Sequence, residues 1–328
     1  MTKRYLNFYE NFNCLAGDCP DTCCAGWNIA LSDEFISANP KYKRFIRKKC
    51  FKNVNGRCPL LQEDGLCEYI AENGQENLNS VCKYHPRYFY DYGAVREVYF
   101  SLSCPETAKL VLNFSDLPAV TIKPEVFPVE PNDIDYNLFV YAEAARNEML
   151  EVIKSEEYDI KSKLSFIYLY GLKLALNIKK ENYTLPDTAK FVRMSKLYNV
   201  LTEKNALKIY SVLKKCDCTR SSLHKVTGTA LENEKFSFNE FTGINNLLYA
   251  FVFDGILKAA VYEDVLSEVK YILSSFIYFM TASGFSEEVY KNSSSPLHEK
   301  IVTDYVREIE HDDRNLSLIN NSLKNFAF

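Results

Sequence analysis

The sequence is poor in glycine, histidine and tryptophan, and neither sign of charge dominates it. Of 328 residues, 11 are glycine, four are histidine and one is tryptophan. Scarce glycine disfavours a fold built from many tight turns, and with it an all-β sandwich. The formal net charge is −4. Because the chain has no overall positive field, we do not expect it to bind nucleic acid or an anionic membrane surface.

Long apolar runs are also lacking. The longest apolar stretch, residues 241–253, is interrupted by Asn245 and Asn246. A membrane-spanning helix needs roughly 18 or more consecutive apolar residues, so no transmembrane segment is expected. The N-terminus has no apolar core of the kind that marks a secretory signal. These absences predict a cytoplasmic protein.

Several motifs of common enzyme folds do not occur. No two glycines are separated by a single residue, which excludes the usual glycine-rich loop of dinucleotide-binding and methyltransferase folds. The P-loop, GxSxG and HExxH motifs are absent as well. The CxxxCxxC triad of the usual radical S-adenosylmethionine enzymes is also missing, because Cys19 and Cys23 supply only its first half.

Cysteine is the residue that the N-terminal third has in excess. Nine of the 11 cysteines lie in the first 104 residues. In a reducing compartment, clustered thiols more often bind metals or take part in catalysis than form disulfides. Eight of them lie beside glycine, proline or a strand end, where a metal-binding loop would place its ligands. We interpret these eight as ligands of zinc or of an iron–sulfur cluster: Cys14, Cys19, Cys23, Cys24, Cys58, Cys67, Cys82 and Cys104.

The spacing of these thiols leaves the number of sites open. The first four form CxxxxCxxxCC, which is neither a zinc ribbon nor a bacterial ferredoxin motif. Adjacent side chains diverge, so Cys23 and Cys24 are expected to share a larger cluster or to belong to two sites. Eight thiols satisfy two four-thiolate sites, or one cluster and a structural site. The alternative is that they are buried or redox-active thiols. The remaining cysteines are interpreted as plain thiols: Cys50, Cys216 and Cys218.

His85 and Arg87 follow Cys82 closely and are weak candidates for catalytic residues. His85 is either a ligand or proton carrier, or a ring that is hydrogen-bonded beside the site. Arg87 could offset thiolate charge or bind a carboxylate. The basic run 41–49 is either a solvated helix face or a docking surface for an acidic ligand.

The apolar pattern predicts a mainly α protein in two parts. Residues 1–116 are expected to form a Cys-rich metal or iron–sulfur module with short β-hairpins, including one at 87–103 that turns at Gly93. Four prolines indicate an extended linker at 117–132, and an α-helical bundle domain is expected at 133–328. Helices are expected at 33–49, 68–73, 107–112, 134–152, 164–172, 187–201, 206–213, 241–262, 265–280 and 297–311. Ser32 is the expected N-cap of the first helix and Gly74 the expected end of the second, and a strand is expected at 27–31.

The order of the cysteine blocks resembles the flagellin lysine-N-methylase (FliB-type) family. The matching residues are Cys14, Cys19, Cys23, Cys24 and Trp27, then CPLL and DGLC within 58–67, then Cys82-Lys-Tyr-His-Pro-Arg87, and SLSCPE at 101–106. The resemblance covers about the first 110 residues, and the helical remainder is similar only in length and character. His85 stands where the family usually has tyrosine, which weakens a catalytic role for this position.

The resemblance implies a protein lysine N-methyltransferase that acts on flagellin. It implies S-adenosylmethionine as methyl donor and dependence on a 4Fe–4S cluster held by the cysteines. The donor-binding residues and the catalytic base are not identified by it. Because a lysine must be neutral to attack, a base or a desolvating pocket is required. The alternatives are a non-catalytic zinc- or iron-binding module joined to a helical interaction domain, and a thiol redox sensor.

Overall fold

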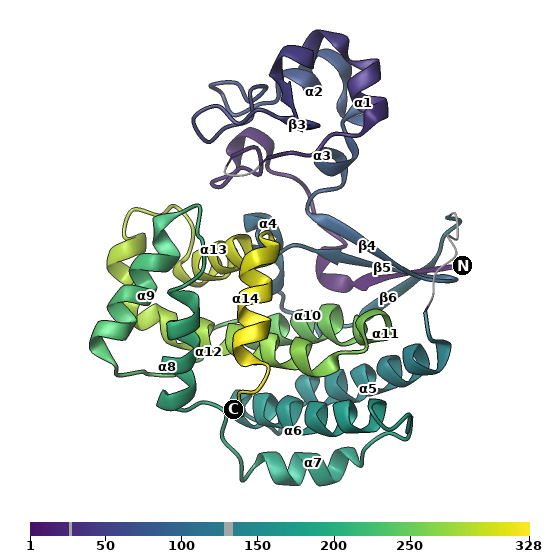
Figure 1. Cartoon of the computed structure of the whole chain (residues 1–328), viewed down its shortest axis with the longest axis vertical. Helices are drawn as coiled ribbons and strands as arrows, with labels where there is room; N and C mark the ends of the chain where they lie inside the picture. Colours follow the sequence, from purple (N-terminus) through teal and green to yellow (C-terminus); the bar gives the residue numbers. More distant parts are fainter. Residues whose placement is uncertain (26–27, 128–133) are drawn as a thin grey trace.

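The computed structural model describes residues 1–25, 28–127 and 134–328. Figure 1 shows a small N-terminal lobe at one end of the molecule, above a larger body of helices. The lobe contains short elements: α1 (Asp33–Ala38), α2 (Glu68–Asn73), α3 (Ser80–Tyr84) and the two-stranded ribbon of β2 (Ile46–Arg47) and β3 (Cys50–Phe51). The protein is mainly helical, as the sequence predicts.

Longer helices build the body, and their boundaries follow the capping residues. Asp135, Asp159 and Asp264 each accept backbone hydrogen bonds at the first turn of α5, α6 and α12, respectively. Such caps satisfy backbone amides that have no partner within the helix. The body helices are α4 (Pro105–Leu112), α5 (Tyr136–Lys154), α6 (Ile160–Ile178), α7 (Thr188–Ser195), α8 (Glu203–Leu213), α9 (Ser221–Asn233), α10 (Ile244–Ile256), α11 (Ala259–Tyr262), α12 (Val265–Tyr290), α13 (Leu297–Glu310) and α14 (Asp313–Leu323).

A four-stranded sheet lies between the lobe and the helices. Its strand order is β4-β5-β1-β6, with bounds β1 (Thr2–Leu6), β4 (Arg87–Tyr92), β5 (Val95–Phe100) and β6 (Val120–Pro124). The N-terminal strand β1 runs parallel to β5 and antiparallel to β6. The first residues of the chain therefore pair with the sheet of the body and not with the lobe (Figure 1).

Helix α12 is the centre of the body. It packs against α6, α8, α9, α10, α13 and α14. Its middle residues Phe276, Ile277, Tyr278 and Phe279 are at most 1% exposed. A helix that is apolar on nearly every face must be surrounded by protein, and this arrangement is what its sequence requires.

A buried ion pair connects the sheet to the helices. Arg146 of α5 donates to both carboxylate oxygens of Glu97 on β5, each at 2.7 Å, and to the carbonyl oxygen of Phe253 on α10 at 3.0 Å. The side chains of Arg146 and Glu97 are 2% and 0% exposed. Paired and hydrogen-bonded charges of this kind hold three elements in one arrangement.

The lobe has a small core of its own. Its buried apolar residues are Ile29, Leu31, Phe35, Tyr42, Phe51, Leu60 and Tyr69. The half-buried thiols of Cys58, Cys67 and Cys82 pack against this core. The cysteines of the lobe therefore form part of the wall of a small hydrophobic cluster.

Several predicted elements are confirmed. The hairpin turns at Gly93, whose φ of 65° lies in the left-handed region. Helix α2 ends at Gly74 as expected, and the Ser32 hydroxyl caps α1 by accepting from the amide of Phe35 at 3.1 Å.

Other predicted elements are wrong in extent. The basic helix expected at 33–49 ends at Ala38, and residues 40–47 continue as a 3₁₀ helix and strand β2. The expected linker contains strand β6, and its residues 128–132 lie outside the described residues. Trp27, part of an expected strand and of the family motif, also lies outside them. The sequence reading missed α9 and α14, whose polar residues obscure the helical period.

One segment, Ile244–Tyr262, is long and apolar enough to cross a membrane by length and composition. In this structure 72% of its apolar window is buried inside the protein. It forms α10 and α11, and α10 packs against α4, α5 and α12. The core helix of a globular body has the same composition, so the segment is weak evidence for a membrane span.

Candidate functional site

The eight candidate ligands lie in the lobe and along its junction with the body. Cys19 ends a short 3₁₀ helix, Cys67 precedes α2, and Cys104 precedes α4. Cys58 and Cys67 flank a tight turn. The amide of Leu61 donates to the carbonyl oxygen of Cys58 at 3.1 Å, and Leu61 forms an antiparallel bridge with Cys67. All eight are free thiols; Cys14 is exposed and the others are half-buried.

Electrostatic interactions divide most of these thiols into two groups. In the first group, burial, with a smaller effect of the charge of Cys24, raises the pKa of Cys58 to about 11 and that of Cys82 to about 12. Cys67 belongs with them, since its pKa is raised by burial and also by Cys24. The thiols of Cys24, Cys58, Cys67 and Cys82 therefore lie within mutual range.

The second group lies against the body. Burial, with smaller effects of the charges of Cys104 and Cys14, raises the pKa of Cys19 to about 11. The pKa of Cys104 is likewise raised by burial first and by Cys14. Cys23 joins the two groups, because it hydrogen-bonds to Cys24 and also senses the charges of Cys14 and Cys82. That hydrogen bond lowers the pKa of the Cys24 thiol to about 7.

The type and number of the cysteine ligands fit a soft metal ion, but the distances between them in this structure do not. Within the described ranges, no group of three or more His, Cys, Asp or Glu side chains is arranged to hold a metal ion. Thiolates are nevertheless the preferred ligands of zinc and iron–sulfur clusters, and each group offers up to four of them. Their mutual repulsion when ionised is what a bound cation would relieve.

Arg87 and His85 lie in different surroundings. The Arg87 guanidinium lies over the rings of Phe12 and Phe100, 5.0 Å from each centroid. Burial lowers its pKa, and the negative charges of Cys14 and Cys104 oppose that change. Arg87 is therefore placed to offset thiolate charge in the second group.

The His85 ring faces His311 instead, with ring centroids 6.4 Å apart. Burial, together with the charge of His311, lowers the pKa of His85 to about 4. The ring is thus neutral at pH 7, which disfavours a role in proton transfer near neutrality.

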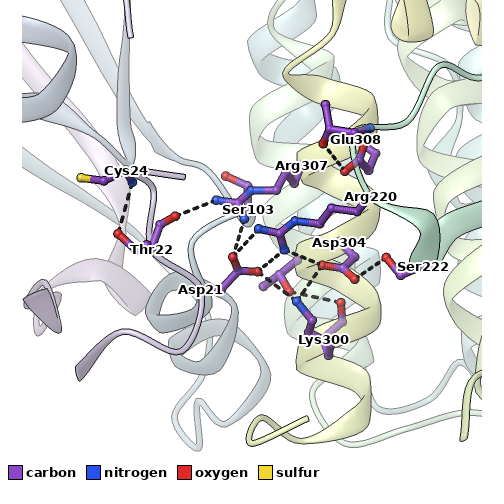
Figure 2. Close-up of polar contacts among 12 residues, drawn as sticks. Asp21, Thr22, Cys24, Ser103, Arg220, Ser222, Lys300, Asp304, Arg307 and Glu308 are labelled. Carbon is purple, nitrogen blue, oxygen red and sulfur yellow. Dashed lines mark hydrogen bonds and ion pairs between the residues drawn. The ribbon is translucent and has the colours of Figure 1, made fainter. Parts of the chain in front are cut away.

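A polar latch fixes the cysteine loop to the body (Figure 2). We use this name for the contacts of Asp21 with Arg220, Lys300 and Arg307. Asp21, 9% exposed, accepts two hydrogen bonds of 2.6 Å from Arg220 and one of 2.9 Å from Lys300. Arg307 completes the set by donating to the same carboxylate.

The latch continues in both directions from Asp21. On the body, Asp304 lies 2.8 Å from the Lys300 ammonium and accepts from the Ser222 hydroxyl at 2.8 Å. On the loop, the Thr22 hydroxyl accepts from the amide of Cys24 at 3.2 Å. Cys23 and Cys24 thus follow Asp21, the centre of this charge network, by two and three residues in the sequence. The sequence reading missed this latch, although the spacing of 300, 304 and 307 places three charges on one face of a helix.

One cavity borders the second thiol group, and a second, smaller cavity lies among the sheet and helices of the body. The larger, about 400 Å³, lies between the cysteine loop and helices α9, α12 and α13, and Asp21, Arg220, Lys300 and Tyr290 line it. Pro20 and Pro105, the neighbours of Cys19 and Cys104, also line it. The smaller cavity, about 30 Å³, is lined by Tyr9 and Phe100 and by residues of α10, α12 and α13.

Charged side chains are concentrated in the smaller cavity. Asp254, Glu268 and Glu310 face it together with Lys258, whose ammonium lies 3.1 Å from Asp254 Oδ1. Burial first, and the charge of Asp254 second, raise the pKa of Glu310 to about 7. Burial alone would lower the pKa of Lys258, but Asp254 and Glu268 raise it well above its usual value. Asp254 and Lys258 are four residues apart, whereas Glu268 and Glu310 come from α12 and α13, so no local pattern predicted that the three carboxyl groups meet.

Comparison with known proteins finds distant similarity. The chain is 29% identical over 135 residues to a protein named Lysine-N-methylase from Salmonella choleraesuis, covering 35% of this chain and 34% of that protein. The Lysine-N-methylase of Salmonella typhimurium matches to the same extent. The flagellar biosynthetic protein FliU of Salmonella muenchen is 29% identical over 132 residues, covering 34% of this chain and 78% of FliU. The match thus spans about a third of the length of the two methylases. No family model and no solved structure matches the chain.

Proposed function

We propose that the protein is an S-adenosylmethionine-dependent lysine N-methyltransferase that modifies flagellin in the cytoplasm. The observation that carries the proposal is the distant similarity to proteins named Lysine-N-methylase and to a flagellar biosynthetic protein. The second thiol group beside the larger cavity is compatible with it, since it offers a soft-ligand site next to space for a substrate.

The eight cysteines are proposed to form two separate sites of four thiolates each. Cys14, Cys19, Cys23 and Cys104 would hold a 4Fe–4S cluster at the junction with the body, beside the larger cavity. Cys24, Cys58, Cys67 and Cys82 would hold a second cluster or a structural zinc ion inside the lobe. The adjacent pair Cys23 and Cys24 would then serve different sites, which relieves the geometric conflict between neighbouring side chains. The cluster would supply the activation of the methyl donor.

The larger cavity is the proposed site of the methyl donor. Its volume of about 400 Å³ lies in the range of small-molecule sites. It combines the cations Arg220 and Lys300 with the carboxylate of Asp304, which suits the zwitterionic end of an amino-acid derivative. Its wall includes the neighbours of Cys19 and Cys104, so a donor held there would lie beside the second thiol group.

The test is methyl transfer by anaerobically reconstituted protein. Flagellin and labelled S-adenosylmethionine are incubated with the protein, and methylated lysines are located by mass spectrometry. The proposal predicts label on flagellin lysines and its loss in Cys104→Ser. Absence of transfer to several flagellins would reject the proposal. A colourless, zinc-replete preparation without activity would support the non-catalytic metal module instead.

A further inference from the structure

The smaller cavity has an excess of negative charge and a shape that fits the tip of a side chain. Asp254, Glu268 and Glu310 contribute three carboxyl groups, whereas Lys258 contributes the single ammonium among its lining residues. A volume of about 30 Å³ holds an ammonium head or a water or two but not a whole ligand. The side chains of Asp254 and Lys258 are 28% and 21% exposed, so the cavity reaches the surface at these residues.

Aromatic rings form the rest of the cavity wall. Tyr9, Phe100, Phe253 and Tyr271 line it together with Tyr99. Tyr9 and Phe100 are stacked, with ring centroids 4.2 Å apart. Aromatic faces attract cations and also pack against methylene groups. The wall therefore suits the carbon chain and the charged head of a lysine side chain.

Two polar groups in the cavity lack hydrogen bonds to the described residues. Tyr9 is 7% exposed, and its hydroxyl has no hydrogen-bond partner there. Asp254 Oδ1 is buried and accepts no hydrogen bond, although the Lys258 ammonium lies near it. Asp254 is already ion-paired with Lys258, but this one ammonium faces three carboxyl groups, so the cavity has acceptors left for a ligand with N–H donors.

Phe100 and Arg87 lie between the cavity and the second thiol group. Phe100 forms part of the cavity wall, and the guanidinium of Arg87 lies over the same ring. Arg87 in turn interacts with the charges of Cys14 and Cys104. A group bound in the cavity would thus be separated from the second thiol group by Phe100 and Arg87.

We propose that this cavity binds the ε-ammonium of the acceptor lysine and that Glu310 is the general base that deprotonates it. The inference rests on the proposed function and identifies its acceptor site. Asp254 and the Tyr9 hydroxyl bind the ammonium, and the aromatic wall excludes water. The Glu310 carboxylate takes one proton, so that R–NH₃⁺ and –COO⁻ become R–NH₂ and –COOH. The nitrogen lone pair is then available for methyl transfer.

The groups that face Glu310 make it suitable for this role. Helix α12 presents Glu268 and Tyr271, and the Tyr271 hydroxyl donates to Glu310 at 2.9 Å. Asp254 and Lys258 face it from α10 and from the turn after α10, and Tyr9 and Tyr88 also sense its charge. Burial, with Asp254 next, raises its pKa to about 7, close to the pH at which a base works best.

Binding is tested first, because it does not depend on methyl transfer. The probes are N-acetyl-lysine methylamide and N-acetyl-norleucine methylamide, which differ only in the ammonium, titrated into the reconstituted protein by calorimetry or NMR. We expect the lysine probe to bind wild type at least 10-fold more tightly than the norleucine probe. Asp254→Asn should reduce this preference at least 10-fold, and Tyr9→Phe about threefold. Glu143→Gln removes a half-buried carboxylate outside the cavity and should leave it unchanged.

Equal binding of the two probes to wild type, or unchanged preference in both Asp254→Asn and Tyr9→Phe, would overturn the inference. Tyr9→Phe keeps the ring and its stacking, so it controls for a variant that fails to fold. Lysine-specific binding by a protein that never transfers a methyl group would reject the proposed function and leave the acceptor cavity supported.

Kinetics then tests the base. Glu310→Gln is expected to lower kcat at pH 7 about 100-fold, to change KM less than threefold, and to abolish the rise of kcat/KM with pH near 7. An active Glu310→Gln variant with the wild-type pH profile would overturn the role of Glu310 while the methyltransferase activity itself stands.

Discussion

The lobe and the body are stabilised in different ways. The body surrounds α12 with helices on several sides and has a large continuous core. The described part of the lobe has a core of seven buried apolar residues, and three thiols are among the half-buried side chains that pack against it. A small domain buries too little apolar surface to be stable alone and usually depends on disulfides or a metal. The lobe cysteines are free thiols. Under the proposed function, a bound metal or cluster would supply the stability that the small core lacks.

Removal of metal should separate the two regions most clearly. Chelation under reducing conditions is expected to increase amide hydrogen exchange in α2 and α3 at least 100-fold, because structural metal sites contribute roughly 10 kcal/mol or more to folding. Exchange in α10 and α12 should stay slow, because their cores contain no candidate ligand. Mass spectrometry of peptides from both regions measures this in one sample. Unchanged exchange in α2 and α3 would mean that the lobe is stable without metal.

Breaking the buried ion pair between Arg146 and Glu97 should destabilise the body and leave the lobe unchanged. Arg146→Met leaves the Glu97 carboxylate buried without its partner, and the free energy of unfolding of the body should fall by about 3–5 kcal/mol. Urea unfolding followed by hydrogen exchange measures the loss. The double variant Arg146→Met/Glu97→Gln should recover part of it, since no charge is then left unpaired. A loss confined to the lobe would contradict the division into two stability units.

The latch should determine how tightly the two regions are joined. Asp21→Asn removes the carboxylate on which Arg220, Lys300 and Arg307 converge, and should ease local opening of residues 14–25 by about 2–3 kcal/mol. Faster exchange in these residues, with α12 unaffected, is the expected result. Asp33→Asn is the matched control. Its ion pair with Lys49 lies within the lobe and is 68% and 65% exposed, so little change is expected.

The smallest expected effect is a pH dependence of the body. The pKa of Glu310 is raised from 4.5 to about 7, so the folded state holds this proton more tightly than the unfolded state. The contribution of Glu310 to the free energy of unfolding is therefore greatest below pH 4.5 and is lost as the pH rises through 7. Lowering the pH from 7.5 to 5.5 should raise the free energy of unfolding by about 1–2 kcal/mol more in wild type than in Glu310→Gln. Equal slopes would show that Glu310 titrates normally.

Sequence predicted local features of both regions better than it predicted their assembly. Gly93, Gly74 and Ser32 predicted a turn, a helix end and a helix start, because each acts through its own backbone or a near neighbour. The pairing of β1 with β5 and β6 was missed, since it joins residues about a hundred positions apart. The basic run 41–49 suggested a helix, yet Lys48 and Lys49 adopt positive φ in the β2–β3 turn.

The candidate site shows the same division between local and distant information. The eight cysteines are visible in sequence because each lies beside glycine, proline or the end of a strand. The latch and the acidic cavity are not visible, because Asp21 meets Arg220, Lys300 and Arg307 only after the chain folds. Glu310 and Asp254 are separated by two helices in the sequence and meet in one cavity. Their altered chemistry is a product of burial, which no local pattern encodes.

The most direct test of the central claim is the iron and acid-labile sulfide content of protein purified without oxygen. If the thiol site holds a 4Fe–4S cluster at the junction, wild type will contain at least about four irons and four sulfides per chain. Cys104→Ser should lose the junction cluster, whereas Cys50→Ser should keep the wild-type content. A protein without iron and sulfide, or a Cys104→Ser variant with the full wild-type content, would contradict the account.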